Sequence, residues 1–154
     1  MKQYNFCFRA TLAFLKLYGW QQVGLVRASV NFDRLSSHSL KNLLKENGIA
    51  VNVELDLDPY MTPDEIIATG KLKTLRNKAR VIIVEMGMDL HLSRSFMVAA
   101  HRFKLKAQDF VFILPWLSHL HDFYPWEATT VDRNEVRVAF DDGNSCLNNV
   151  LFCF

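Results

Sequence analysis

The chain has 154 residues, of which 50% are hydrophobic and 12% aromatic, and its formal net charge is +2. This size and composition indicate one domain, or one piece of a larger protein, with enough apolar side chains to bury a core, and they exclude an intrinsically disordered chain. The small net charge gives no overall case for binding nucleic acid or an acidic membrane surface, and no apolar run approaches the roughly 20 residues that span a bilayer.

The N-terminal segment predicts a helix followed directly by a strand. Apolar residues recur at helical spacing and mark one face of the helix, formed by Phe6, Ala10, Ala13 and Leu17. Gly19 follows and suits a C-terminal cap, because glycine enters the left-handed conformation without steric cost. The run "VGLVR" then indicates a buried strand over residues 22–28.

The next segment repeats this order of helix, glycine and strand. A second helix carries an apolar stripe made by Leu40, Leu43 and Leu44, and Gly48 ends it. The segment "IAVNVELDL" alternates apolar and polar residues, which predicts a strand over residues 50–57 with one wetter face. Such a strand is typical of the edge of a sheet.

A third helix has a sharp start signal. Thr62 is the expected N-cap, Pro63 the first helical residue, and Glu65 completes a capping box. The apolar stripe continues through Ala68, Leu72, Leu75 and Ala79, so we expect one helix, weakened by Gly70 by about 1 kcal/mol. The run "RVIIVEM" then predicts a buried strand over residues 80–86.

Two more helices and one more strand complete the pattern. The fourth helix, with Asp89 as its expected cap, is marked by Leu92, Phe96, Ala99, Ala100 and Phe103. The run "DFVFILPW" predicts a strand over residues 110–115 that Pro115 stops. The last helix opens at Asp132 and Glu135, ends at Gly143, and places Val136, Ala139 and Phe140 inside.

Alternating helices and strands indicate an α/β fold with an open parallel sheet, strand order 2-1-3-4, and helices on both faces. In such a sheet the carboxyl ends of the strands form the functional edge, at the point where the strand order reverses. For this order the crevice lies between the first and third strands. The candidate ligand-binding residues at these strand ends are Arg27, Ser29, Asn31, Glu85, Met86, Met88 and Trp116.

The motifs of common catalytic and nucleotide sites are absent. The segment "RASVNFD" after the first strand has no glycine, so it offers no dinucleotide loop, and neither a phosphate loop nor a G-x-S-x-G nucleophile turn occurs. Glu85 and Asp89 are too far apart in sequence for the clustered carboxylates of a phosphoacceptor site. The sequence therefore favours a binding domain without cofactor over an enzyme.

Three other features have ordinary explanations. His119 and His121, with Asp122, could ligate a metal, but a short histidine cluster in a loop is more often a surface feature, and we expect no metal site. The basic stretch "KLKTLRNKAR" is best explained as the solvated face of a helix rather than a phosphate site. The three cysteines are Cys7, Cys146 and Cys153, and the last two could pair or remain ordinary thiols.

Four stretches of the chain resemble the ligand-binding region of the receptor family with a type I periplasmic-binding-protein fold. They are "LAFLKLYGWQQVGLV", "LKNLLKENGIAVNVE", "KLKTLRNKARVIIVEM" and "DFVFILPWL". The entry from Gly19 and Trp20 into the first strand is the most specific mark. The last strand, followed by Pro125 and Trp126, looks closest to the extracellular domains of receptor-type guanylate cyclases, relatives of the natriuretic peptide receptors. The resemblance covers about residues 9–142.

This resemblance implies a two-lobed clamshell with ligand in the cleft or at a dimer surface, on the extracellular side of a cell membrane. The chain matches one lobe, over residues 1–142, and residues 143–154 form a divergent tail. These 154 residues contain no membrane span, kinase-like domain or cyclase domain, and Arg9 interrupts the stretch that would form the apolar region of a signal peptide. We therefore expect a fragment or truncated gene product.

Two functions remain open. The chain is either a lobe of a sensory receptor ectodomain that binds a peptide or small molecule, with a receptor homodimer as a possible assembly, or an α/β module for protein association without a small ligand. Apolar residues near the crevice edge and in the tail, among them Val30, Phe32, Met86 and Met88, lead us to expect marginal stability and self-association of the chain alone.

Overall fold

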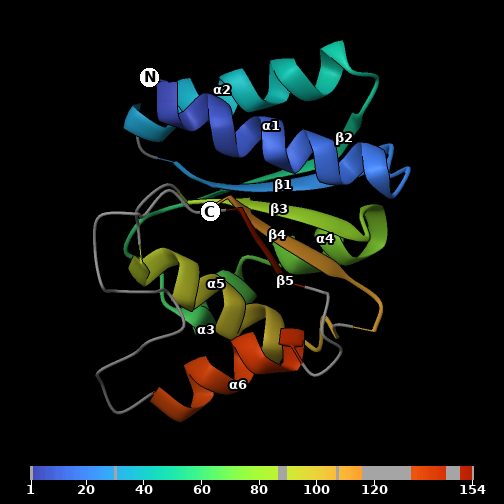
Figure 1. The fold of residues 1–154 in the computed structure, drawn as a ribbon. Helices are drawn as coiled ribbons and strands as arrows, with labels where there is room; N and C mark the ends of the chain where they lie inside the picture. The colour runs from blue at the N-terminus through green and yellow to red at the C-terminus, as the bar shows by residue number, and fades with distance from the viewer. Residues whose placement is uncertain are drawn as a thin grey trace.

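The computed structural model describes residues 2–29, 31–86, 90–106, 108–115, 133–144 and 150–153. In this part of the chain, parallel strands form a five-stranded sheet in the order β2-β1-β3-β4-β5. The strands are β1 (Gln22–Ala28), β2 (Ala50–Leu57), β3 (Val81–Glu85), β4 (Val111–Pro115) and β5 (Val150–Cys153). Figure 1 shows the sheet between two layers of helices.

The predicted fold class, an open parallel sheet with the order 2-1-3-4 and helices on both faces, is confirmed. The predicted strands agree with β1 to β4 to within one residue at each end. β2 lies at the sheet edge and β3 at its centre, as the alternating and the fully apolar sequences indicate. β5 extends the sheet beyond β4 and comes from the segment expected to be a divergent tail, with Val150 opposite Phe112.

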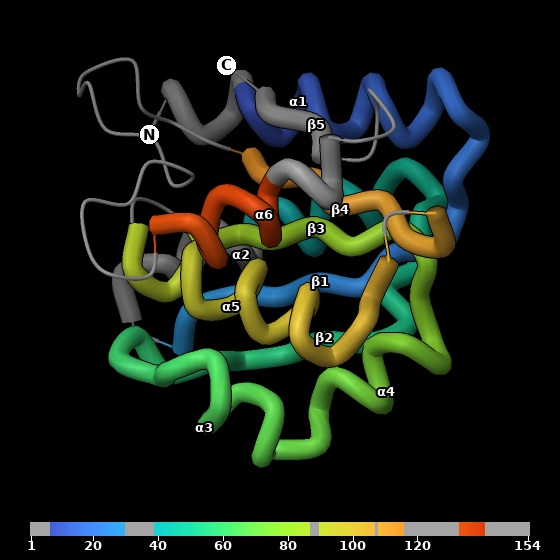
Figure 2. The backbone as a smooth tube through the Cα atoms, turned by 90° about the horizontal axis from the view of Figure 1, so that it is seen from below, coloured from blue at the N-terminus to red at the C-terminus, as the bar shows by residue number. Residues whose placement is uncertain are grey.

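Helices cover both faces of the sheet (Figure 1). The helices are α1 (Lys2–Leu17), α2 (Asn31–Glu46), α3 (Pro63–Ala68), α4 (Lys71–Lys78), α5 (Leu90–Arg102) and α6 (Arg133–Asn144). α1 and α2 lie on one face, and α3 to α6 lie on the other. Figure 2 shows α3 and α4 near the β2 end of the sheet and α1 at the other end, on the side of β4.

Two apolar clusters fill the space between the sheet and its helices. The smaller cluster joins α1 and α2 to the sheet and includes Phe8, Leu15, Leu25 and Ile83. The larger cluster joins α3, α4, α5 and α6 to the opposite face. Successive residues of a strand point to opposite faces, so neighbours such as Leu25 and Val26 belong to different clusters.

The buried face of α1 differs from the predicted one. Phe8, Thr11 and Leu15 are buried, whereas Ala13 is exposed and Leu17 keeps 75% of its surface accessible. The expectation that Ala13 and Leu17 face the core is therefore wrong. The helix carries apolar side chains on more than one side, and the packing against the sheet selects the side that periodicity alone leaves ambiguous.

The single helix expected over residues 62–79 is also wrong. Gly70 has a φ of 70°, in the left-handed region, and separates α3 from α4. Ala68 is consequently exposed rather than part of a continuous buried stripe. The capping box is confirmed, because the Glu65 amide donates to the Thr62 hydroxyl and the Thr62 amide donates to the Glu65 carboxylate.

Glycine ends two helices on the α1/α2 side. Gly19 and Gly48 have φ values of 68° and 74°, respectively. Beyond Gly19 the amide of Trp20 donates to the carbonyl of Leu15 at 2.8 Å, which closes the helix end and turns the chain into β1. α6, by contrast, does not stop at Gly143 but continues to Asn144. The expected caps Asp89 and Asp132 lie outside the described residues.

Arg102 at the end of α5 joins three helices. Its guanidinium donates to Asp64 of α3 at 2.6 Å and to both carboxylate oxygens of Glu135 of α6 at 2.6 and 2.8 Å. The hydrogen bonds from Arg102 hold the pKa of Glu135 below its usual value. These bonds fix α6 against α5 beside the apolar contacts of Val136, Ala139 and Phe140.

Candidate functional site

The carboxyl ends of β2, β1 and β3 bring three charged residues into one row. Arg27 of β1 lies in register with Asp56 of β2 on one side and with Glu85 of β3 on the other. By strand alternation, all three lie on the face that α1 and α2 cover. This row occupies the crevice position between the first and third strands that the strand order predicts.

Arg27 is held by carboxylates of the neighbouring strand. Its Nε and one terminal nitrogen contact both oxygens of Asp56, and the same terminal nitrogen lies 3.1 Å from Glu54. The hydrogen bond to Asp56 is the main cause that raises the pKa of Arg27, and the charges of Glu54 and Glu85 add to it. Lys41 of α2 contacts the other oxygen of Glu54 at 2.5 Å, which extends the network to a helix.

Glu85 is the buried carboxylate of this row, with 2% of its surface exposed. It follows Ile83 on the α1/α2 face of the central strand and lies in register with Arg27. Burying a carboxylate is unfavourable unless a cation or hydrogen bonds compensate for the lost water. Among the described residues of this edge, Arg27 on the adjacent strand is the cation whose charge interacts with that of Glu85.

Ser29 ties the ends of β1 and β2 together. Its amide donates to the carbonyl of Leu57 at 2.8 Å, and its hydroxyl donates to Asp58 at 2.6 Å. The carbonyl of Asp56 also accepts a hydrogen bond from the Lys71 ammonium at 2.8 Å. These bonds fix both strand ends, so the polar groups of the edge are presented by a rigid backbone.

The structure places four of the predicted site residues and leaves three untested. Arg27, Ser29 and Glu85 lie together at the carboxyl edge. Met86 is 2% exposed within the larger apolar cluster, so the expectation that it presents an accessible surface at the edge is wrong. Asn31 begins α2, but its side chain, and the residues Met88 and Trp116, lie outside what the structure describes.

Sequence reasoning missed the carboxylates of β2. Glu54 and Asp56 of β2, and Asp58 directly after it, surround Arg27 and Ser29, yet none was a predicted site residue. The signal was present in "VNVELDLD", because strict alternation assigns these acids to the face opposite Val53 and Leu55. The position of β2 beside β1 then brings the acids next to Arg27.

Other predicted features are distributed as follows. Among the residues that the structure describes, no group of three or more His, Cys, Asp or Glu side chains could hold a metal ion, and His119 and His121 lie outside them. No helix of the described part is long and apolar enough to cross a membrane.

Of the cysteines, Cys146 lies outside the described residues, and Cys7 is buried in α1. The basic side chains of α4 are exposed, as expected for a solvated face.

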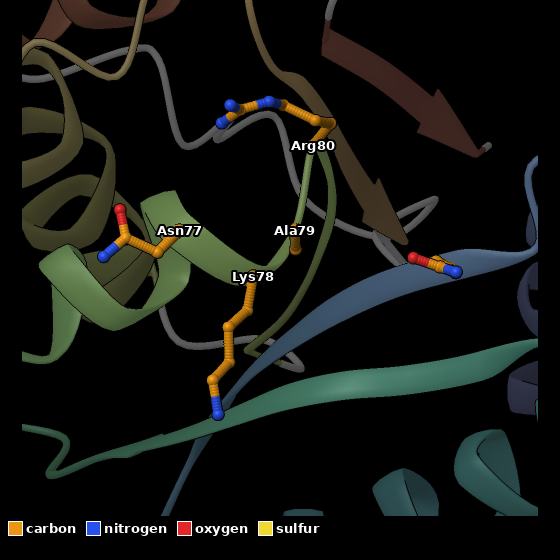
Figure 3. A pocket seen from close by; sticks show the side chains of 5 residues that line it. Asn77, Lys78, Ala79 and Arg80 are labelled. Atoms are coloured by element: carbon orange, nitrogen blue, oxygen red, sulfur yellow. The ribbon is translucent and has the colours of Figure 1, made fainter.

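A shallow cavity of about 200 Å³ lies at the opposite, amino-terminal edge of the sheet. Gln22, the first residue of β1, and residues 77–80 line it. Figure 3 shows the side chains of Asn77, Lys78 and Arg80 pointing in different directions around Ala79. Arg80 also lies over the ring of Phe110, 4.9 Å from its centroid. With no convergent polar groups, this cavity is a poor ligand site.

An open parallel α/β sheet with charged groups at its carboxyl edge defines the class of open α/β binding domains. Residues 3–146 match the receptor family ligand binding region, and the chain belongs to that family. The family is defined by ligand binding, not by catalysis.

The chain is similar to two curated proteins of Caenorhabditis elegans. It is 26% identical over 152 residues to the receptor-type guanylate cyclase gcy-8, which covers 92% of this chain. It is 29% identical over 120 residues to the receptor-type guanylate cyclase gcy-23, which covers 76% of this chain. The chain spans only 13% and 11% of the lengths of these two relatives, respectively.

Proposed function

We propose that this chain is a ligand-binding lobe of a sensory receptor ectodomain of the receptor guanylate cyclase type, on the extracellular side of a cell membrane. The ligand is a peptide or small molecule that contacts the carboxyl edge of β1 and β3. The observation that carries this proposal is the row of charged groups at the strand ends, where the partly exposed Arg27 contacts the carboxylates of Glu54 and Asp56. The similarity to receptor-type guanylate cyclases supports the receptor type.

The chemistry of the edge favours a ligand with polar groups of both kinds. The exposed carboxylates of Asp56 and Asp58 accept hydrogen bonds, whereas the partly exposed Arg27 and Ser29 can donate them. A peptide backbone or an amino-acid-like molecule supplies matching donors and acceptors. The chain itself carries no cyclase activity in this proposal, and its contribution is recognition.

Binding can be tested by the thermal unfolding of the whole chain in the presence of panels of peptides and small polar molecules. A ligand at about 100 times its Kd stabilises the folded state by about 2.7 kcal/mol and raises the unfolding midpoint. We expect Asp56→Asn and Ser29→Ala to reduce this shift for the same ligand.

Lys73→Ala is the matched control, because Lys73 is an exposed residue of α4, which packs on the face of the sheet opposite α1 and α2. A ligand whose shift survives both edge substitutions binds elsewhere, and this would disprove the proposed site. The absence of any stabilising ligand across both panels would favour the alternative, an association module without a small ligand.

A further inference from the structure

The outward face of α1 combines an apolar stripe with a basic stripe. Arg9 and Lys16 are exposed and lie seven residues apart, which places them along one line of the helix. Ala13 and Leu17 lie beside this line and are also exposed, while Ala10 and Phe14 are half-buried. This stripe is distinct from the buried side chains of Phe8, Thr11 and Leu15 that pack on the sheet.

Beyond the end of the helix, the stripe continues in two aromatic residues, Tyr18 and Trp20. Tyr18 is 57% exposed and stacks on Trp20, with ring centroids 4.8 Å apart. Leu17, next to this pair, is 75% exposed. Burying the apolar area of this leucine and tyrosine would stabilise the protein by roughly 25 cal/mol per Å². Their exposure therefore leaves this stabilisation available to a partner that covers them. A contiguous apolar strip of this kind is typical of a contact surface.

The charges of α1 restrict what can cover this face. The helix "KQYNFCFRATLAFLKL" contains no aspartate or glutamate. Lys16 donates to Asn47, the residue after α2, at 2.7 Å, which fixes its position but leaves its positive charge uncompensated in that contact. A second copy of α1 would therefore bring like charges together, whereas an acidic partner would complement them.

The sizes of the side chains restrict the partner further. Ala10 and Ala13 occupy the middle of the stripe, and their small side chains allow another helix to approach closely. Interfacial helices insert Trp, Phe and Leu into the acyl region of a bilayer. Here Phe14 and Trp20 are half-buried in the fold. This leaves only Leu17 and Tyr18 as large exposed apolar groups among the described residues of this surface. The stripe thus fits a helix better than a lipid surface.

We propose that the outward face of α1 is a docking surface for an amphipathic helix that carries acidic residues beside an apolar stripe. The small residues of α1 receive the apolar stripe of the partner, and Arg9 and Lys16 pair with its carboxylates. This surface lies on the helix layer of the domain and not at the strand ends, so the proposal is independent of the ligand proposed above.

Photo-crosslinking from α1 tests this surface. The whole chain carries the photoreactive residue p-benzoylphenylalanine in place of Ala13, or in place of Lys73 as a control, and is irradiated in the cells that produce it. We expect adducts from position 13 whose peptide, identified by mass spectrometry, is an acidic amphipathic helix. The double substitution Arg9→Glu, Lys16→Glu should lower the adduct yield about tenfold, equivalent to about 1.4 kcal/mol. Lys73→Glu should leave it unchanged.

Every other result overturns the proposal. Adducts to lipid would identify a membrane contact, and adducts to a second copy of this chain would identify self-association. A protein adduct that survives the charge reversal, or a yield no higher than at position 73, would show that the basic stripe recognises nothing. If the charge-reversed chain loses its helical circular dichroism, the neutral variant Arg9→Gln, Lys16→Gln replaces it and should lower the yield in the same direction.

Discussion

At the scale of single residues, the opposite charges of Arg27 and Glu85, which lie in register on neighbouring strands, organise the carboxyl edge of the sheet. Glu85 is a buried carboxylate, and Arg27, with 19% of its side chain exposed, is surrounded by the carboxylates of Glu54 and Asp56 as well. The guanidinium therefore offsets the charges of Asp56 and Glu85 and shares that of Glu54 with Lys41. Removing it leaves acids of one sign in a partly dry site.

We expect Arg27→Met to lower the free energy of unfolding by about 2 kcal/mol, because the carboxylates around it lose their counter-charge. Glu85→Gln on top of Arg27→Met should restore part of this loss, since a neutral amide needs no cation. Urea unfolding at pH 7 of the wild type, both single variants and the double variant gives the coupling between the two positions.

Lys73→Met is the control for removing an exposed cation and should leave the unfolding free energy within about 0.5 kcal/mol of the wild type. Strictly additive effects of Arg27→Met and Glu85→Gln would mean that the two side chains do not depend on each other. The edge would then be organised by the β2 carboxylates alone.

At the scale of elements, Gly24 sets how closely α4 approaches the sheet. A Cβ atom at this position of β1 would lie 2.8 Å from a methyl carbon of Leu75, 3.0 Å from the Cβ of Ala79 and 3.2 Å from Val53. Leu75 and Ala79 belong to the end of α4, which packs on this face of the sheet. The absence of a side chain at Gly24 therefore allows α4 and its C-cap Ala79 to pack close to β1.

Gly24→Ala should destabilise the fold by about 1–3 kcal/mol, because the added methyl group pushes α4 away from β1. Thermal or urea unfolding measures the loss. Adding Leu75→Val should relieve part of it, so the double variant should lose less than the sum of the two single changes. A neutral Gly24→Ala would indicate that α4 moves freely on the sheet and that the close contact is unimportant.

The elements also separate what the sequence predicts from what it leaves open. Strand positions follow from apolar runs such as "RVIIVEM", because a fully buried strand admits few alternatives. The buried side of α1 does not follow, since Ala13 and Leu17 fit helical periodicity as well as Phe8 and Leu15 do. The break at Gly70 depends on a backbone conformation that glycine permits but does not dictate.

The same limit applies to the candidate site. Strand ends could be predicted from the sequence, so Arg27, Ser29 and Glu85 were placed at the correct edge. Whether a side chain at a strand end points to solvent or to the core depends on strand parity relative to the helix layers. That is why Met86 packs in the larger apolar cluster while Glu85, one residue earlier and equally buried, lies on the opposite face in register with Arg27.

At the scale of the whole molecule, β5 determines how the sheet ends. β5 pairs in parallel with all but the first residue of β4, from Phe112 to Pro115. β4 is almost entirely apolar and buried, so without β5 it would expose an unpaired strand edge. Met86 is buried, so it does not contribute to the expected self-association of the chain. We expect self-association instead through the edge of β4 when β5 does not cover it.

A chain that ends at Asn144 keeps α6 but lacks β5. We expect it to self-associate at micromolar concentration, because the free amide and carbonyl groups of an apolar strand edge pair with those of another copy. Sedimentation velocity of the truncated chain should show species larger than the monomer, in contrast to a control chain that lacks Phe154 only and retains β5. If both chains sediment as the same species and unfold at the same temperature, β5 does not protect the sheet. In that case β4 would resist pairing with another copy for two other reasons. It is short, and it ends at Pro115, which lacks the amide that a partner strand would bond.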